Sequence, residues 1–331
     1  MKFSRKLLIL PMFWMLLAGC SPTPTFLDPH SSIAGHEANL YKIILIMALV
    51  VFVLVEGALV FILVRDRHKK GDTKPAPQIH GNTSLEVTWT VIPIFLVIAL
   101  FVMTVQTVNA VAAPAPSKSD INLHIIGHRW WWEFDYPDLG IKTANELHIP
   151  VGATVQITLD SVDVIHSFWV PQLSGKTDVI PGQTNSMWLT ADQIGVFHGQ
   201  CAEFCGVDHA NMRFRVIVES QADFDAWAAN QQKDAPQPQT DLEKQGYKII
   251  TTGICSNCHT LDGTDAKGEI GPNLTHLYSR STFAGSIIDL NENNIHNWLE
   301  NTQAIKPGNN MIVKLDDNEI NVLMAYLKLL K

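Results

Sequence analysis

Apolar residues form two long, nearly uninterrupted runs in the first third of the chain. The first extends from Tyr41 to Val64, which is 24 residues, and the second from about Val87 to Ala112. An α-helix rises about 1.5 Å per residue, so the first run reaches about 36 Å and can span the hydrocarbon core of a bilayer. We therefore predict a hairpin of two transmembrane helices at about residues 41–64 and 87–112.

A shorter apolar run, from Leu7 to Leu17, follows a basic N-terminus. It is too short to span a bilayer and has the form of an export signal over residues 1–19. The four residues that end in Cys20 (Leu-Ala-Gly-Cys) resemble a bacterial lipobox, so we expect Cys20 to be lipidated. An ordinary cleaved signal with an incidental cysteine is the alternative.

The loop between the two long runs is basic, from Arg65 to Lys70. Short basic loops stay in the cytoplasm, which places everything after residue 112 on the outer face of the membrane. Glu56 lies inside the first run, and a carboxylate at that depth implies a partner within the membrane. The pattern predicts a two-pass protein of the bacterial plasma membrane.

After residue 118 the apolar positions alternate with polar ones, as at residues 155–159 and 212–218, and turns such as Ile180-Pro181-Gly182 separate these runs. This pattern predicts an antiparallel β-sandwich or barrel over residues 118–230. A polar linker follows at 231–240. Residues 241–331 then have a helical pattern, so we predict a multidomain chain that ends in a small all-α domain.

Composition agrees with a protein that lies partly in lipid. Hydrophobic residues make up 47% of the 331 residues, while charged residues make up 17%, below the roughly 25% of a soluble domain. The 24 basic and 32 acidic residues give a net charge of −8. This charge argues against a nucleic-acid partner, whose phosphates would require a basic surface.

Soft metal ligands gather between Cys201 and Met212, a segment that also contains Cys205 and His209. Thiolates, imidazole and thioether together suit copper, and the second cysteine permits two coppers that share both sulfurs. The second histidine must then come from another strand, where His166 is available. A Cys201–Cys205 disulfide, a zinc site and a thioredoxin-type copper chaperone are the alternatives.

A second cysteine motif lies in the helical segment. Cys255, Cys258 and His259 form a C-x2-C-H sequence, the signature of covalent haem c attachment. Cysteines three apart on a helix share a face, so both can form thioethers to one porphyrin, and His259 then lies beneath the iron.

The second axial ligand of such a haem should come from downstream. Met311 lies on a turn-rich segment, and a thioether ligand raises the potential of the iron. Met324 lies on the apolar face of the last helix and is expected in the core. His276 and His296 are the alternatives for a haem of low potential.

Three stretches, residues 127–132, 166–171 and 175–182, and the cysteine segment closely resemble subunit II of haem-copper cytochrome c oxidases. The resemblance covers about residues 35–230 and implies a cupredoxin-like sandwich. Residues 241–331 resemble small class I cytochromes c. The fusion of the two is similar to the caa3 type of oxidase.

The resemblance implies a dinuclear copper A centre. By it, Cys201 and Cys205 bridge the two coppers, and His166 and His209 are their terminal ligands. Met212 is a weak ligand of one copper.

It also implies roles for three further residues. The backbone carbonyl of Glu203 would be a weak ligand of the other copper, and its side chain would bind Mg²⁺ at the interface with subunit I. Trp130 matches the tryptophan at which electrons arrive. Glu86 matches an acid at the mouth of a proton pathway, although by spacing alone it completes a capping box begun by Thr83.

These implications predict subunit II of a proton-translocating oxidase. An external cytochrome or bc1-type donor would reduce the covalent haem c, and copper A would pass the electron to subunit I, which holds haem a and the oxygen-reducing haem–copper centre. Subunit III and membrane lipid are the other expected partners. The rivals are a stand-alone membrane-tethered electron carrier, the copper module of a nitrous-oxide-reducing enzyme and a copper-delivery protein. A quinol-oxidising relative would lack the copper ligands.

Overall fold

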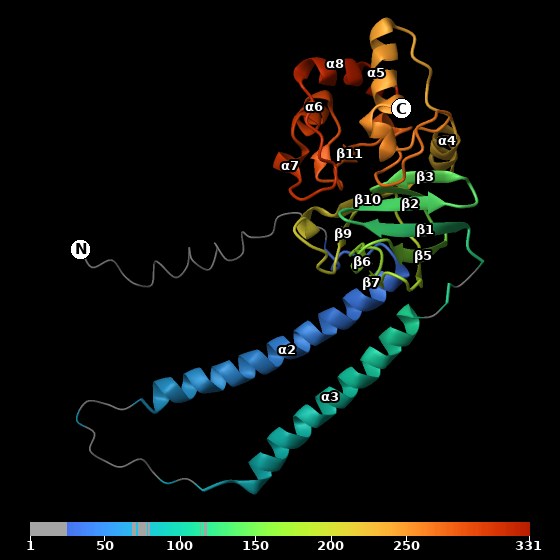
Figure 1. Ribbon diagram of the computed structural model, residues 1–331. Coiled ribbons are helices and arrows are strands. Elements are labelled where there is room, and N and C mark those ends of the chain that lie inside the picture. Colours follow the sequence, from blue (N-terminus) through green and yellow to red (C-terminus); the bar gives the residue numbers. More distant parts are fainter. Residues whose placement is uncertain (1–24, 68–70, 72–77, 79, 113, 116–117) are drawn as a thin grey trace, which may run out of the picture.

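A computed structural model describes residues 25–67, 71, 78, 80–112, 114–115 and 118–331. The expected export signal and Cys20 lie outside the described residues. The described chain forms a helical hairpin, a two-sheet domain and a helical domain, in that order along the sequence (Figure 1).

The hairpin consists of α2 (Ser32–Arg65) and α3 (Thr83–Val111). Their most apolar 18-residue windows have mean hydropathies of 3.0 and 2.5, and both windows are exposed. These apolar surfaces therefore need lipid or other membrane helices to cover them. The predicted capping box at Thr83 is wrong: Asn82 is the N-cap, because its side chain accepts hydrogen bonds from the amides of Ser84 and Leu85.

α2 begins about nine residues before the predicted span, because its first turns pack on the next domain. Ser31 caps the helix, and its hydroxyl donates to the carbonyl of Leu173 at 2.5 Å. Ala34 and Ala38 are fully buried. The start of α2 is therefore fixed to the folded part of the chain rather than embedded in lipid.

Two five-stranded sheets form the β-sandwich domain (residues 118–231). One sheet has the order β3 (Ile141–Ala144), β2 (Trp131–Tyr136), β1 (Ile121–His128), β5 (Val155–Ser161), β8 (Asn185–Leu189). The other has the order β4 (Glu146–Pro150), β10 (Arg213–Glu219), β9 (Gly195–Cys201), β6 (His166–Trp169), β7 (Thr177–Val179). The predicted sandwich is present, but it is mixed rather than purely antiparallel, because β1 pairs with β5, and β10 with β4, in parallel.

Aromatic side chains fill the space between these sheets. Trp132, Phe134, Phe168 and Phe214 are fully buried, and the rings of Phe168 and Phe214 stack at 4.5 Å. A Cβ at Gly199 would lie 2.1 Å from the Phe214 ring, so only glycine fits on β9 at that point. The helix α4 (Gln221–Gln231) closes the domain by burying Phe224 and Ala228.

The helical domain (residues 241–331) is built around two crossing helices, α5 (Asp241–Thr252) and α8 (Asp317–Leu327), each begun by a capping box. The remaining elements are short: η2 (Ile254–Asn257), η3 (Leu277–Ser279), β11 (Thr282–Phe283), β12 (Ile288–Asp289), α6 (Glu292–Glu300) and α7 (Thr302–Ile305). α5 and α8 touch at Gly246, where a Cβ would lie 2.4 Å from the carbonyl oxygen of Val322.

The segment between the two domains is packed against the helical domain. Ala235 is buried and its amide donates to Asp262 at 3.0 Å, while the Tyr326 hydroxyl donates to the Pro236 carbonyl at 3.0 Å. The helical domain lies directly on the β-sandwich domain, on the side opposite the membrane hairpin (Figure 1). The two domains therefore form a contact rather than being joined by an extended tether.

Candidate functional site

The soft donors predicted from the sequence converge at one end of the β-sandwich. The Sγ atoms of Cys201 and Cys205 lie 3.8 Å apart, and His166 Nδ1 lies 3.9 Å from Cys201 Sγ. His209 Nδ1 and Met212 Sδ lie 3.5 and 3.8 Å from Cys205 Sγ. All five residues predicted as side-chain copper ligands therefore meet in one cluster.

The pairing of two strands brings the distant histidine, His166, next to the cysteines. β6 pairs with β9 so that Phe168 lies opposite Cys201, and His166, two residues earlier, projects from the same face of β6. Cys201 is the last residue of β9, and the remaining donors lie in the loop that follows, which includes the 3-10 turn η1 (His209–Asn211). We call residues 201–212 the cysteine loop.

The donor set fits copper. Ligand atoms of His166, Cys201 and Cys205 lie within 4.8 Å of one another and are buried. Both cysteines are free thiols, and Cys201 Sγ also lies 3.2 Å from the carbonyl oxygen of Glu203. Two thiolates, imidazole, thioether and a carbonyl form a soft, water-excluding site with the ligand chemistry that copper prefers.

Hydrogen bonding divides the charge between the two thiols. The hydrogen bond with Cys205, together with that from His166, holds the pKa of Cys201 well below the ordinary thiol range. The same pairing with Cys201, and burial, raise the pKa of Cys205. The two thiols are therefore unequal as acids, and a metal that binds both sulfurs as thiolates must displace whatever proton they retain.

Asp163 orients the distant histidine, and the sequence analysis missed it. Its Oδ1 lies 2.9 Å from His166 Nε2, which leaves Nδ1 facing Cys201. Burial alone would raise the pKa of Asp163, but hydrogen bonds from His166 and from two backbone amides lower it. Burial likewise opposes charge on His166, yet its bonds to Asp163 and Cys201 raise the pKa of the imidazole. An acid three residues before a candidate ligand was the available sequence signal.

The side chain of Glu203 points away from this cluster. It is 45% exposed and lies 3.5 Å from Lys176 Nζ. Among the residues that the structure describes, no further carboxylate or histidine joins it in a metal-binding group.

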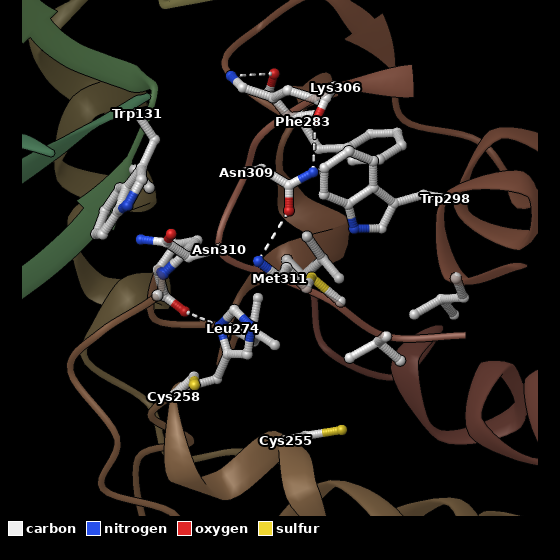
Figure 2. A pocket seen from close by; sticks show the side chains of 18 of the residues that line it. Trp131, Cys255, Cys258, Leu274, Phe283, Trp298, Lys306, Asn309, Asn310 and Met311 are labelled. Carbon is white, nitrogen blue, oxygen red and sulfur yellow. Dashed lines mark hydrogen bonds between the residues drawn. The ribbon is translucent and has the colours of Figure 1, made fainter. Parts of the chain in front are cut away.

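The C-x2-C-H residues line a cavity of about 310 Å³ in the helical domain, and residues 129–131 and 144–145 of the β-sandwich domain line one side of it (Figure 2). The two cysteines lie on and just after the 3-10 helix η2, rather than on the predicted α-helix. His259 Nδ1 donates to the carbonyl oxygen of Pro272 at 2.8 Å, which leaves Nε2 available to a metal. The cavity is mostly apolar, with Trp298 and Leu299 in its wall, and so suits a porphyrin.

Met311 lines the same cavity, where Figure 2 shows it beside Trp298. The amide of Met311 donates to Asn309 Oδ1 at 2.8 Å, and the Thr302 hydroxyl donates to its carbonyl. The three competing ligands lie elsewhere. Met324 packs in the helical core, His276 bonds two backbone carbonyls through its ring nitrogens, and His296 lies beside Asp317.

Trp130 connects the two sites. It lines the cavity of the helical domain, is 7% exposed, and donates through Nε1 to the carbonyl oxygen of Cys205 at 3.0 Å. The structure therefore places this side chain between the C-x2-C-H cavity and the cysteine loop. Glu86 and Glu56 are remote from both sites, on exposed faces of the hairpin helices.

Comparison with protein families assigns all three parts of the chain. Residues 22–106 match the transmembrane domain of cytochrome C oxidase subunit II, and residues 140–220 match its periplasmic domain. Residues 243–331 match cytochrome c. The hairpin therefore belongs to a membrane protein whose folded domains face the periplasmic side.

Relatives align along the whole chain. It is 38% identical to "Cytochrome c oxidase subunit 2" of Alkalihalophilus pseudofirmus, over 100% of this chain and 98% of the relative. It is 34% identical to the protein of the same name in Bacillus subtilis, over 100% and 98% of the two chains. "Quinol oxidase subunit 2" of Bacillus spizizenii is 36% identical but covers 73% of this chain.

One solved structure, the periplasmic domain of subunit II of cytochrome oxidase of Bradyrhizobium japonicum, is 31% identical over 35% of this chain and 95% of that one, with a TM-score of 0.34. The family of this chain is shown by the family matches and by the relatives that align along its whole length. The copper-type donor cluster and the C-x2-C-H cavity agree with the two families matched. The chain thus belongs to the cytochrome c oxidase subunit II family and carries a C-terminal cytochrome c domain.

Proposed function

We propose that this chain is the electron-accepting subunit of a caa3-type cytochrome c oxidase. The cytochrome c domain would hold a covalent haem c that takes electrons from an external cytochrome or bc1-type donor. The cysteine loop and His166 would hold a copper A centre that supplies electrons to haem a and the haem–copper centre of subunit I. The observation that carries this proposal is the position of Trp130, which lines the cavity and bonds to the cysteine loop.

Particular residues of this chain would hold the cofactor at each of the two sites. Cys201 and Cys205 would bridge the two coppers, and the other ligands are His166, His209, Met212 and the carbonyl of Glu203. Cys255 and Cys258 would bind the porphyrin covalently, and His259 and Met311 would bind its iron. Copper A and haem c, when bound, supply reversible one-electron chemistry; the protein holds them, excludes water and fixes their positions.

A cytochrome rather than a quinol is the proposed donor. The chain keeps every soft donor of the cluster, and it has a cytochrome c domain whose cavity holds the C-x2-C-H residues. A quinol-oxidising subunit has no use for either feature. The complete donor set therefore favours the cytochrome-oxidising reaction.

The remaining parts of the chain fit an exported membrane subunit. We propose that residues 1–19 are a cleaved signal, that Cys20 is lipidated, and that residues 20–117, 118–230, 231–240 and 241–331 are the membrane segment, copper domain, linker and haem domain. The exposed apolar faces of α2 and α3 would pack against subunit I, subunit III and lipid of the plasma membrane. Glu86 would serve proton uptake, and Glu203 would bind Mg²⁺ jointly with subunit I.

Purification in mild detergent, followed by metal analysis and visible spectroscopy, tests the proposal. We expect two coppers and one covalent haem c per chain, together with a partner subunit that contains haem a. Recovery of the chain alone with both cofactors would indicate a stand-alone electron carrier. One copper or none beside the haem would reject the copper A assignment.

A further inference from the structure

A buried ammonium group of the helical domain reaches into the β-sandwich domain. Lys306 is 3% exposed, and its Nζ donates to the carbonyl oxygens of Trp130 at 2.6 Å, Asn211 at 2.9 Å and Ala284 at 3.1 Å. The carboxylate of Asp208 lies 3.4 Å from the same atom. Every donor of this ammonium therefore has a partner, and two of the three carbonyls belong to the other domain.

A buried carboxylate makes the reciprocal contact. Glu146, on β4 of the β-sandwich domain, is 2% exposed. It accepts hydrogen bonds from the amide and hydroxyl of Ser281, at 3.1 and 2.6 Å, and from the amide and hydroxyl of Thr282, both at 2.8 Å. Each domain thus inserts one charge into the other, where backbone groups and polar side chains of the other domain contact it.

These contacts select one arrangement of the domains. A buried charge is tolerated only where its partners are in place, so a different docking that still buried Lys306 or Glu146 would leave that group desolvated and unpaired. Between the two charges, the Arg213 amide donates to Gly285 at 3.1 Å and the Ser286 hydroxyl donates to Asn145 at 3.0 Å. Hydrogen bonds with defined geometry therefore contribute to the interface beside the two charged groups.

Lys306 also joins the loops of the two sites. It lies five residues before Met311, and its carboxylate partner Asp208 precedes His209 in the cysteine loop. The two loops touch at Gly308, where a Cβ would lie 2.6 Å from Val207. The carbonyl of Trp130 is fixed by the same ammonium that holds these loops together.

We propose that Lys306 and Glu146 lock the helical domain in one docked position on the β-sandwich domain, with Lys306 as the positioning residue that fixes Trp130 between the two sites. The role of this lock in electron transfer rests on the function proposed above; the lock itself does not. Electron transfer within the chain then needs no excursion of a tethered domain.

The test uses the full-length chain in detergent with both cofactors bound. Lys306→Met and Glu146→Gln each remove one charge, and exposed Lys314→Met and Glu300→Gln are the matched controls. Hydrogen exchange is read at the contact opposite to each substitution: at Ser281 and Thr282 for Lys306→Met, and at Arg213 for Glu146→Gln. Loss of one partner of a buried charge should speed exchange at the opposite contact about a hundredfold or more, while the controls leave it unchanged.

Electron transfer from haem to copper after flash reduction is the second measurement. We expect it to be slower in both lock variants, with unchanged haem absorption and copper resonance spectra. If Lys306→Met disturbs either cofactor, Glu146→Gln decides the question, because Glu146 lies in neither ligand loop.

Unchanged exchange at the opposite contact in Glu146→Gln would overturn the lock. An unchanged transfer rate in a variant whose exchange has accelerated would overturn the proposed role of Lys306 in positioning Trp130. A wild-type chain without haem-to-copper transfer, but with the expected exchange changes, would instead overturn the proposed function and leave the lock standing.

Discussion

Asp163 shows how one residue outside the ligand set can determine the chemistry of the site. Its carboxylate binds His166 Nε2 and also accepts from the amide of Arg129 at 2.7 Å, next to Trp130. It therefore fixes both the orientation of His166, a proposed copper ligand, and the start of the segment that carries Trp130. Carboxylates that hold a metal-binding histidine in this way commonly raise its ligand strength.

Asp163→Asn should weaken copper binding by about 10- to 100-fold, because the amide cannot hold the His166 ring as a carboxylate does. Copper content after dialysis against a graded chelator measures the change. Asp225→Asn, on the exposed face of α4, is the control and should bind copper as the wild type does. Equal copper retention in Asp163→Asn would show that strand geometry alone orients His166.

Two methionines of the helical domain offer a matched comparison. Met311→Ala should open the axial position, lower the haem potential and change the visible spectrum, while leaving the copper spectrum unaltered. Met324→Ala should leave the haem spectrum intact but destabilise the domain by about 2–5 kcal/mol, since Met324 is 6% exposed in the core. Redox titration and thermal unfolding separate the two effects, and an unaltered spectrum in Met311→Ala would reject it as a ligand.

At the scale of elements, the crossing of α5 over α8 supports the wall of the haem cavity. Ile250 on α5 and Leu323 and Leu327 on α8 are buried, and all three line the cavity. The close approach at Gly246 is what permits this crossing, because no Cβ separates the two backbones there. The register of β6 against β9 plays the corresponding part for the copper cluster.

Gly246→Ala should push α5 and α8 apart and destabilise the helical domain by roughly 1–3 kcal/mol, which exceeds the gain in helix propensity of about 1 kcal/mol. Loss of haem absorption on heating reports the unfolding of this domain. Gly35→Ala, where nothing lies within 4 Å, is the same substitution in an open position and should leave that transition unchanged. Equal transitions in both variants would show that the helices can separate without cost.

At the scale of the whole molecule, the two domains are joined through charges that are buried only when the domains are docked. Burial lowers the pKa of Lys306 to about 8, although the nearby Asp208 opposes the shift. The ordinary value is 10.5, which the unfolded chain regains. The ammonium of Lys306 therefore loses its proton at a lower pH in the docked molecule than in the unfolded chain.

Between pH 8 and 10.5 the unfolded state binds more protons at this residue, so the contribution of Lys306 to stability rises with pH. The difference in unfolding free energy between the wild type and Lys306→Met should grow by up to about 1.4 kcal/mol per pH unit across this window and stay constant below it. Thermal transitions of both proteins at several pH values measure it. A difference that is flat or shrinks with rising pH would contradict the shifted pKa.

Local features of the sequence determined the main parts of this protein. A few neighbouring residues are enough to define each of these parts, so they could be predicted from the sequence: the two apolar runs, the C-x2-C-H motif, the cysteine loop and the alternating strands. His166 was predicted from a different kind of reasoning, namely that the loop lacked one imidazole. The helix cap at Thr83 was wrong because the side chain of Asn82 accepts from the amides of Ser84 and Leu85, and the helix therefore begins at Thr83 itself.

Only the tertiary structure decided which residues meet across the fold. The parallel pairing of β1 with β5, the bond of Asp163 to His166 and the burial of Glu146 and Lys306 depend on segments brought together from distant parts of the chain. A lysine and a glutamate on a polar stretch look like surface residues in a sequence. They are buried because each has partners on another domain, and the spacing of residues along the sequence does not reveal such a contact.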